Sequence, residues 1–315
     1  MDPLSDVLRA VRLTGAYFYL SAGRDPWSVY ASPARDLVPH VLPEAQHLIS
    51  YHVLVTGSCW GAVDGEDPVH LSPGDVIMFP HGDAYRMASK NGGSLTPSPY
   101  TTAPRRYPET AYLGPDGERE TTFVCGFLGC DVRPFNPLLA SLPRLIHCPG
   151  AASGWLSEFP KRAVAESRTT TAGSETMLTR MAELMFIDVI RHHIESLPEQ
   201  NSGWLAGLRD AVVGPALTCL HSRPAHPWTL AELAREISTS RTVLASRFSS
   251  LVGVSPMTYL TRWRLQLASE QLARGSAKVA AIGAQVGYDS EAAFSRAFKR
   301  ETGVSPAAWR RARPT

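Results

Sequence analysis

The carboxyl-terminal part of the chain contains one structural pattern twice, fifty residues apart. Each copy closes with the same four residues, Gly-Val-Ser-Pro, at 253–256 and again at 303–306. A glycine ends a helix by adopting a left-handed conformation, a serine caps the next helix, and a proline fits the first turn of that helix. The repeated signal therefore predicts a set of short helices in this part of the chain.

Each copy predicts two helices joined by a tight turn. In the first copy Thr229 and Ser240 each precede an apolar helical stripe, which is the position of an N-cap. A longer helix between the copies would hold the two pairs about one duplex turn, roughly 34 Å, apart. The pattern predicts two helix-turn-helix units, and a generic helical bundle is the alternative. The predicted helices span 228–237, 241–248, 257–274, 279–286 and 290–299.

Charge is divided unequally along the chain, although the formal net charge is only +2. From Arg223 onward there are 14 Lys and Arg against 6 Asp and Glu, a net charge of +8. Residues 1–222 carry 17 against 23, a net charge of −6. A basic module beside an acidic one indicates that only the basic module meets a polyanion such as DNA, because phosphate contacts supply most non-specific DNA affinity.

The segment over 227–313 resembles the AraC/XylS family of transcription regulators. The resemblance is carried by Trp-Thr-Leu at 228–230, Arg-Phe at 247–248, Arg-Trp-Arg at 262–264, Val-Gly-Tyr at 286–288 and Ala-Phe-Ser-Arg-Ala-Phe-Lys at 293–299. It implies that the second helix of each unit enters the major groove of double-stranded DNA, and that RNA polymerase is a further partner. The residues it implies for DNA binding are Arg241, Thr242, Ala245, Ser246, Arg247, Glu291, Ala292, Ser295, Arg296 and Lys299. Of these, Arg241 and Arg296 are the best candidates for base contacts, whereas Arg247 and Lys299 are expected to meet phosphates or solvent.

The amino-terminal half shows short apolar runs separated by turns, which predicts strands of a sandwich or barrel. Its glycine and proline spacing at 74–82 resembles a cupin motif, but Tyr85 and Ser89 stand where metal ligands would be expected. We therefore expect no metal and no cofactor. Residues 88–120 are predicted to form a long loop. The predicted strands span 49–55, 59–63, 69–71, 76–79 and 121–128.

The half as a whole looks like the cupin-type sensory domain found on a subgroup of these regulators, which implies an unidentified small-molecule effector. Tyr51, His52, Trp60 and Tyr85 are candidates to line its pocket, or else they are core and rim residues. Some related regulators respond to reactive chlorine through cysteines. Cys125 matches one such position, so it is a candidate redox residue, and a small buried side chain is the other interpretation.

The expected fold is an α+β multidomain chain. A cupin-like β-barrel is followed by helices, and an all-α domain carries two helix-turn-helix units joined by a linker helix. The expected domains are a sensory domain over 1–172, a helical connector and candidate dimerisation region over 173–222, and a DNA-binding domain over 223–315. The helix predicted from residue 174 could join two copies in a homodimer or pack on the barrel.

We expect a sequence-specific transcription regulator in the cytoplasm, without enzyme activity and without contact with a membrane, since no run of the sequence is apolar enough to span one. Two other classes of protein remain open at this point. A cupin enzyme with an accessory DNA module would bind stoichiometric metal, and an architectural protein would bind unrelated duplexes almost equally.

Overall fold

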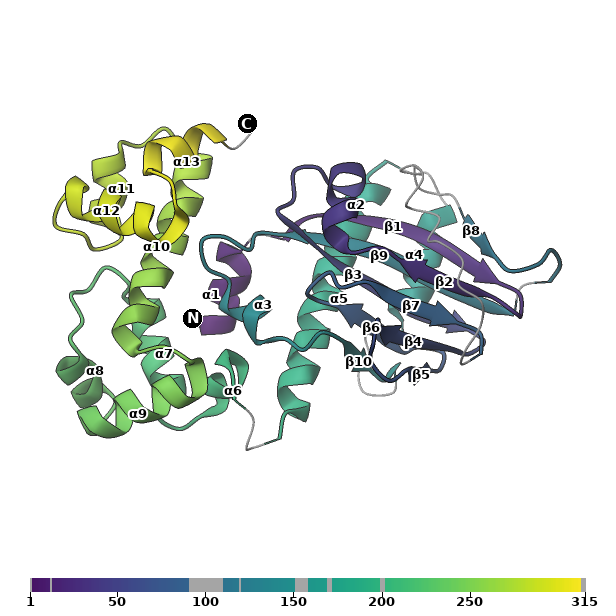
Figure 1. Ribbon diagram of the computed structural model, residues 1–315, viewed down its shortest axis with the longest axis horizontal. Coiled ribbons are helices and arrows are strands. Elements are labelled where there is room, and N and C mark those ends of the chain that lie inside the picture. The colour runs from purple at the N-terminus through teal and green to yellow at the C-terminus, as the bar shows by residue number, and fades with distance from the viewer. Residues whose placement is uncertain are drawn as a thin grey trace. The chain divides into compact units, whose positions relative to one another are not determined.

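The structure is a computed structural model that describes residues 2–11, 13–90, 110–118, 120–150, 158–168, 172–198 and 202–312. The chain forms two compact units (Figure 1). We call Leu13–Asp131 with Leu142–Ser196 the sheet unit, and Met1–Arg12, Val132–Ser141 and Leu197–Thr315 together the helical unit. The three-domain division expected from the sequence stays a prediction.

The sheet unit contains two sheets, with strand orders β10-β6-β3-β9-β1-β8 and β2-β7-β4-β5. One continuous apolar core includes Tyr19 and Phe127 from the first sheet and Val63 and Met87 from the second. The cupin-like fold is confirmed, but the described strands form two sheets and not a closed barrel. The strands are β1 Leu13–Gly23, β2 Ser28–Ala31, β3 His47–Thr56, β4 Cys59–Val63, β5 Val69–Leu71, β6 Val76–Phe79, β7 Tyr85–Ala88, β8 Thr110–Leu113, β9 Thr121–Cys130 and β10 Ile146–Cys148.

The long loop predicted over 88–120 lies partly outside the described residues, which omit 91–109 and 119. Where the segment is described, the prediction was wrong for 110–113, because β8 pairs in parallel with β1. Ala111 and Leu113 are buried while Tyr112 is exposed, as the alternation of a strand requires. A strand of four residues shows too little alternation to be recognised in the sequence.

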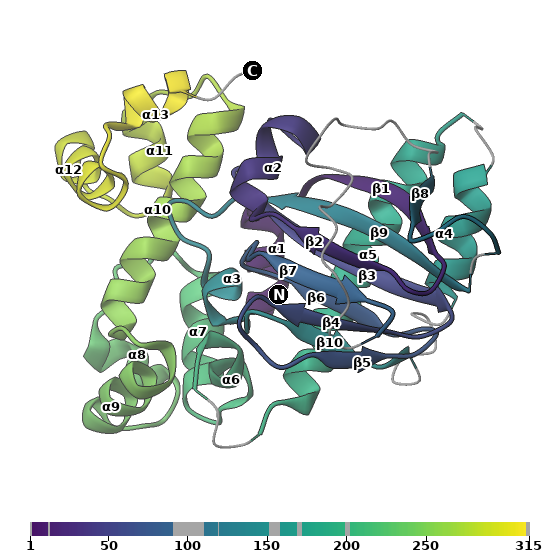
Figure 2. The same ribbon diagram turned by 45° about the vertical axis from the view of Figure 1, so that its right-hand side comes forward.

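Three helices of the sheet unit pack on its strands (Figure 2). They are α2 Ala34–Val41, α4 Phe159–Arg168 and α5 Ser174–Ser196. One face of α5, which includes Met185 and Ile190, is buried, and the helix packs on β1 and β10. Met177 and Leu184 on the same helix remain exposed. The helix predicted from residue 174 therefore packs on the sheet along one face, and its other side is accessible.

The helical unit is built around α10, which is 19 residues long and contacts helices on both sides of it in the sequence (Figure 1). Its N-cap is Ser255, whose side chain accepts a hydrogen bond from the amide of Thr258, so the predicted cap is present. In the part of the chain that the structure describes, no helix is long and apolar enough to cross a membrane. The helices are α1 Pro3–Ala10, α3 Pro137–Ser141, α6 Trp204–Arg209, α7 Val213–Ser222, α8 Leu230–Glu236, α9 Arg241–Val252, α10 Pro256–Arg274, α11 Val279–Gln285, α12 Glu291–Thr302 and α13 Pro306–Ala312.

Residues from the start and the middle of the chain are integrated into this unit through Gln266 on α10. Its side-chain amide donates to the carbonyl of Ala10 at 2.9 Å and accepts from the amide of Phe135 at 3.1 Å. Gln266 is buried, so both bonds are shielded from water. On a neighbouring part of α10, the hydroxyl of Tyr259 contacts Nε1 of Trp204 and Nε2 of His221, each at 2.8 Å.

The segment between α5 and α8 contains a helix break. Two helices, α6 and α7, are separated at residues 210–212. The carboxylate of Asp210 accepts hydrogen bonds from the amides of Val212 and Val213 at 2.9 and 2.8 Å. An acidic side chain that takes up the free amides at a helix start favours a new helix there.

Candidate nucleic-acid interface and interior cavity

The first helix-turn-helix unit is formed by α8 and α9. Thr229 accepts from the amide of Glu232 at 3.1 Å, and Ser240 accepts from the amide of Val243 at 3.1 Å, so both predicted caps are present. Leu244 and Phe248 on α9 are fully buried. Because this inner face is in the core, the opposite face of α9 is left accessible to solvent.

The second unit is formed by α11 and α12 and follows the same plan. Ser290 caps α12 by accepting from the amide of Ala293 at 3.2 Å. Phe294 and Phe298 are buried on its inner face. The turn between the helices contains Gly287 with a φ of +89°, and a Cβ there would lie 2.6 Å from the carbonyl oxygen of Ala225. The turn therefore requires glycine for both its backbone conformation and the space available.

All ten residues predicted to contact DNA lie on α9 and α12, and none of them is buried. Ala245 and Ser295 are half-buried, and the other eight are exposed. The side chains of Arg241 and Arg296 have no hydrogen-bond or ion-pair partner among the residues that the structure describes. Those two guanidinium groups are free to donate to an external acceptor.

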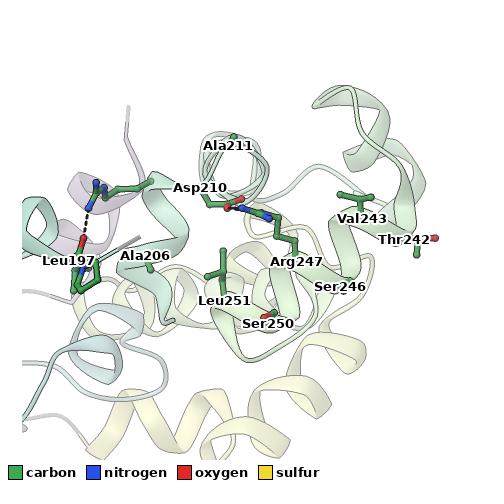
Figure 3. Close-up of a pocket in the computed structure, with 12 residues that line it drawn as sticks. Leu197, Ala206, Asp210, Ala211, Thr242, Val243, Ser246, Arg247, Ser250 and Leu251 are labelled. Carbon is green, nitrogen blue, oxygen red and sulfur yellow. Dashed lines mark hydrogen bonds and ion pairs between the residues drawn. The ribbon is translucent and has the colours of Figure 1, made fainter. Parts of the chain in front are cut away.

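Arg247 differs from these, because it is already paired within the protein (Figure 3). Its Nε and Nη2 atoms lie 2.7 and 2.6 Å from Oδ2 of Asp210. The pair borders an open depression of about 840 Å³ between α9 and the residues around the α6–α7 break. Sequence reasoning did not identify Asp210, although aspartate is a common residue at the start of a helix.

A second candidate site is a cavity of about 30 Å³ inside the sheet unit. His52 and Tyr85 line it together, and Nε2 of His52 lies 2.7 Å from the phenol oxygen of Tyr85. Cys125 also lines it, directly opposite His52 on the neighbouring strand. Sequence reasoning missed most of the apolar lining. The described residues that line it are Tyr19, Ser21, Trp27, Val29, His52, Tyr85, Met87, Leu113, Phe123 and Cys125.

The other two predicted pocket residues, Tyr51 and Trp60, do not line this cavity. Tyr51 is fully buried and packs edge-on against Phe18, whereas Trp60 is half-buried with its ring against His70. Successive side chains of a strand point to opposite faces, so Tyr51 and His52 could not both face one cavity. Strand alternation was the signal that separates them.

The cavity is lined by neutral groups. Burial lowers the pKa of His52 to about 3, which keeps its imidazole uncharged at neutral pH. Its Nδ1 atom has no hydrogen-bond partner among the described residues. Burial also raises the pKa of Cys125 to about 12, and this thiol lies 3.6 Å from the hydroxyl oxygen of Ser21. A thiol with so high a pKa contains very little of the reactive thiolate at neutral pH.

These side chains do not fit the metal centre of a cupin enzyme, which needs several imidazole or carboxylate ligands. The lining offers one imidazole and one protonated thiol. Within the described ranges, no three His, Cys, Asp or Glu side chains form a group that could hold a metal ion.

Comparison with known proteins places this geometry in a family. A cupin family model matches residues 2–195, and a helix-turn-helix domain model matches residues 233–312. An AraC-like transcription regulator of Streptomyces antibioticus is 35% identical over 99% of both chains. A second, from Streptomyces lividans, is 33% identical over 99% of this chain and 98% of its own. The HTH-type transcriptional regulator AlkR of Acinetobacter baylyi is 27% identical over 98% of this chain and 99% of its own.

The two capped helix pairs and these matches define a DNA-binding regulator of transcription that carries a cupin-type domain. The chain belongs to the AraC family of transcription regulators.

Proposed function

We propose that α9 and α12 are the recognition helices, and that each reads base edges in the major groove through its exposed face. The observation that carries this proposal is that two separately capped helices bury their aromatic side and present their other side to solvent. The basic charge of this part of the chain supports it, because a duplex is a polyanion. The proposed base-facing residues are Arg241, Thr242, Ala245, Ser246, Glu291, Ala292, Ser295 and Arg296.

Arg296 is the residue that tests this assignment most directly. An arginine that donates two bonds to a guanine contributes about 1 to 3 kcal/mol of discrimination against other bases. Arg296→Ala should therefore weaken binding to the preferred duplex and remove the preference at one base pair. Arg300→Ala on the same helix is the matched control, because it removes an equal charge from another exposed position.

The measurement is binding of the full-length variants to a duplex selected from a random pool, and to single-base variants of that duplex, at one salt concentration. Loss of preference in Arg296→Ala together with uniform weakening in Arg300→Ala would support the proposal. Equal weakening on all duplexes by Arg296→Ala would show that this side chain contacts phosphate only.

We also propose that the cavity of the sheet unit widens to take an uncharged effector with a hydrogen-bonding group, since its volume of about 30 Å³ in this structure holds no more than a water molecule. The unpartnered Nδ1 of the buried His52 supports this, because a buried polar atom gains from a partner. Among the described residues that line the cavity, none carries a fixed charge, which disfavours an ionic ligand. An effector alters DNA binding only if it binds two conformations with different affinity.

A thermal-shift screen of small neutral compounds tests the effector site. Compounds that stabilise the natural protein should lose most of that effect in Tyr85→Phe, which removes the hydroxyl beside His52. Tyr112→Phe is the matched control, because Tyr112 is exposed on β8. Equal stabilisation of all three proteins would place the ligand elsewhere. Stoichiometric iron or manganese in the purified protein would instead favour the enzyme alternative.

We further propose that two chains associate through the accessible side of α5. Its exposed Met177 and Leu184 support this, because apolar side chains are enriched at the centre of homodimer interfaces. Sedimentation of Leu184→Glu should show a monomer where the natural protein is a dimer, and an unchanged dimer would contradict it.

Contact with RNA polymerase is proposed as the route from bound DNA to altered transcription, without assignment to particular residues.

A further inference from the structure

Asp210 contacts two structural elements with its two carboxylate oxygens. Oδ1 accepts from the amides of Val212 and Val213 and so caps the start of α7. Oδ2 accepts from Arg247 in the middle of α9. Burial acts to raise the pKa of Asp210, but the hydrogen bonds from Arg247 and from the two amides lower it overall. The carboxylate is therefore ionised and fully engaged at neutral pH.

A second contact fixes the same face of α9 one helical turn further on. The amide of Gly203, directly before α6, donates to the carbonyl of Leu251 at 2.8 Å. Positions 247 and 251 are four apart, so they lie on one side of the helix. Figure 3 shows Asp210 and Arg247 facing each other, with Leu251 on the same side of α9. Two polar contacts on one stripe hold α9 against rotation about its own axis and against sliding.

The ion pair also limits what Arg247 can do. The side chain of Asp210 is only 7% exposed, whereas that of Arg247 is 57% exposed. If the guanidinium left to bind a phosphate, a nearly buried carboxylate would lose its charged partner, which is costly. Its positive charge is also offset at 2.6 Å by the carboxylate. Arg247 is thus poorly placed to add a phosphate contact.

We infer that Asp210 is a positioning residue for DNA recognition, which acts through Arg247 to set the orientation of α9. The inference rests on the proposed role of α9 as a recognition helix. It assigns Arg247 to the internal support of that helix and not to the DNA surface. A small rotation of α9 would move all its exposed side chains relative to base edges, so loss of the pair weakens recognition without removing any DNA contact.

The sign of the effect of Asp210→Asn separates this inference from simple electrostatics. Asparagine can still cap α7, but it loses the charge that holds Arg247. Removing a negative charge near DNA would by itself tighten binding, whereas loss of positioning weakens it. We expect binding of the full-length variant to the selected duplex to weaken by about two- to tenfold, the lower range of coupling between contacting residues.

Arg247→Gln and Arg247→Lys complete the test. Loss of one phosphate contact lowers the slope of log K against log salt by about 0.9, so an unchanged slope in Arg247→Gln supports positioning. Lysine can still meet a phosphate as a point charge but cannot present two nitrogens to one oxygen. We therefore expect Arg247→Lys to weaken binding as Arg247→Gln does. The double variant Asp210→Asn with Arg247→Gln should be no weaker than either single variant.

Tighter binding by Asp210→Asn, a slope reduced by about one unit in Arg247→Gln, or near-natural binding by Arg247→Lys would each overturn the inference. Circular dichroism melting confirms that each variant is folded at the assay temperature. Arg241→Ala in the same assay reports on α9 itself. If it leaves base preference unchanged, the recognition role of α9 fails. If it relaxes base preference while Asp210→Asn has no effect, only the positioning role fails.

Discussion

Replacing Gln266 with leucine should detach two distant segments from α10. The side chain is 2% exposed and bonds to the carbonyl of Ala10 and the amide of Phe135. The first partner can only accept and the second can only donate, which fixes the orientation of the glutamine amide. Leucine has similar volume but bonds to neither, so both backbone groups would lose their partner in a buried place.

The magnitude follows from those two groups. A buried backbone group left without a partner costs about 1 to 3 kcal/mol, so Gln266→Leu should destabilise the helical unit by roughly 2 to 4 kcal/mol after partial relaxation. Gln271→Leu on the same helix is the matched control, because Gln271 is only half-buried. We expect a change below about 0.5 kcal/mol for that variant.

Hydrogen exchange read by mass spectrometry, together with urea unfolding, measures this effect in the full chain. In Gln266→Leu the amides of α1 and of residues 132–141 should exchange faster, while those of β3 stay unchanged. Gln266→Glu keeps the acceptor for Phe135 but loses the donor to Ala10, so α1 alone should lose protection. Unchanged exchange at both segments in Gln266→Leu would refute the reasoning.

Two further predictions concern the sheet unit. Because the folded pKa of His52 is about 3 and the unfolded value is near 6.5, only the unfolded chain gains this proton between pH 7 and 5. Stability then falls as the pH drops, with about 2 kcal/mol from this residue, and the fall in the free energy of unfolding measured in urea should be smaller by that amount in His52→Gln. Gly82 has a φ of +66°, and a Cβ there would lie 2.5 Å from that of Ala34. Gly82→Ala should destabilise the protein by about 2 kcal/mol or more. Gly65→Ala is the control, because Gly65 has a φ of +85° but nothing within 4 Å of its Cβ, so it should show only the backbone cost of about 1 kcal/mol. Equal losses of stability in the two variants would contradict the steric argument.

The helical elements of the carboxyl-terminal part were predictable because their signals are local. Thr229, Ser240, Ser255 and Ser290 each cap the predicted helix, since a cap depends on an amide two or three residues away. The central strands of the sheet unit were predictable for the same reason. Each is a short apolar run bounded by turn residues.

What the sequence did not reveal depends on partners far along the chain. The pairing of β8 with β1 joins residues about ninety positions apart, and Arg247 meets Asp210 across 37 positions. The cavity was predicted only in part, because Ser21 and Trp27 reach it from strands and turns whose local sequence carries no distinctive signal. Such contacts are set by the packing of whole elements and not by short-range preference.

The helical unit combines a helix near the start of the chain with helices near its end, and this affects the order in which the protein can fold. The bond from Gln266 to Ala10 spans 256 residues, so the contacts between α1 and α10 cannot form during synthesis until α10 emerges. Contacts of such long separation form slowly, because a large loop must close first. All residues of the sheet unit precede residue 197, so that unit can be complete before the DNA-binding helices are made. A newly made chain would then contain a folded sheet unit before it can contact DNA.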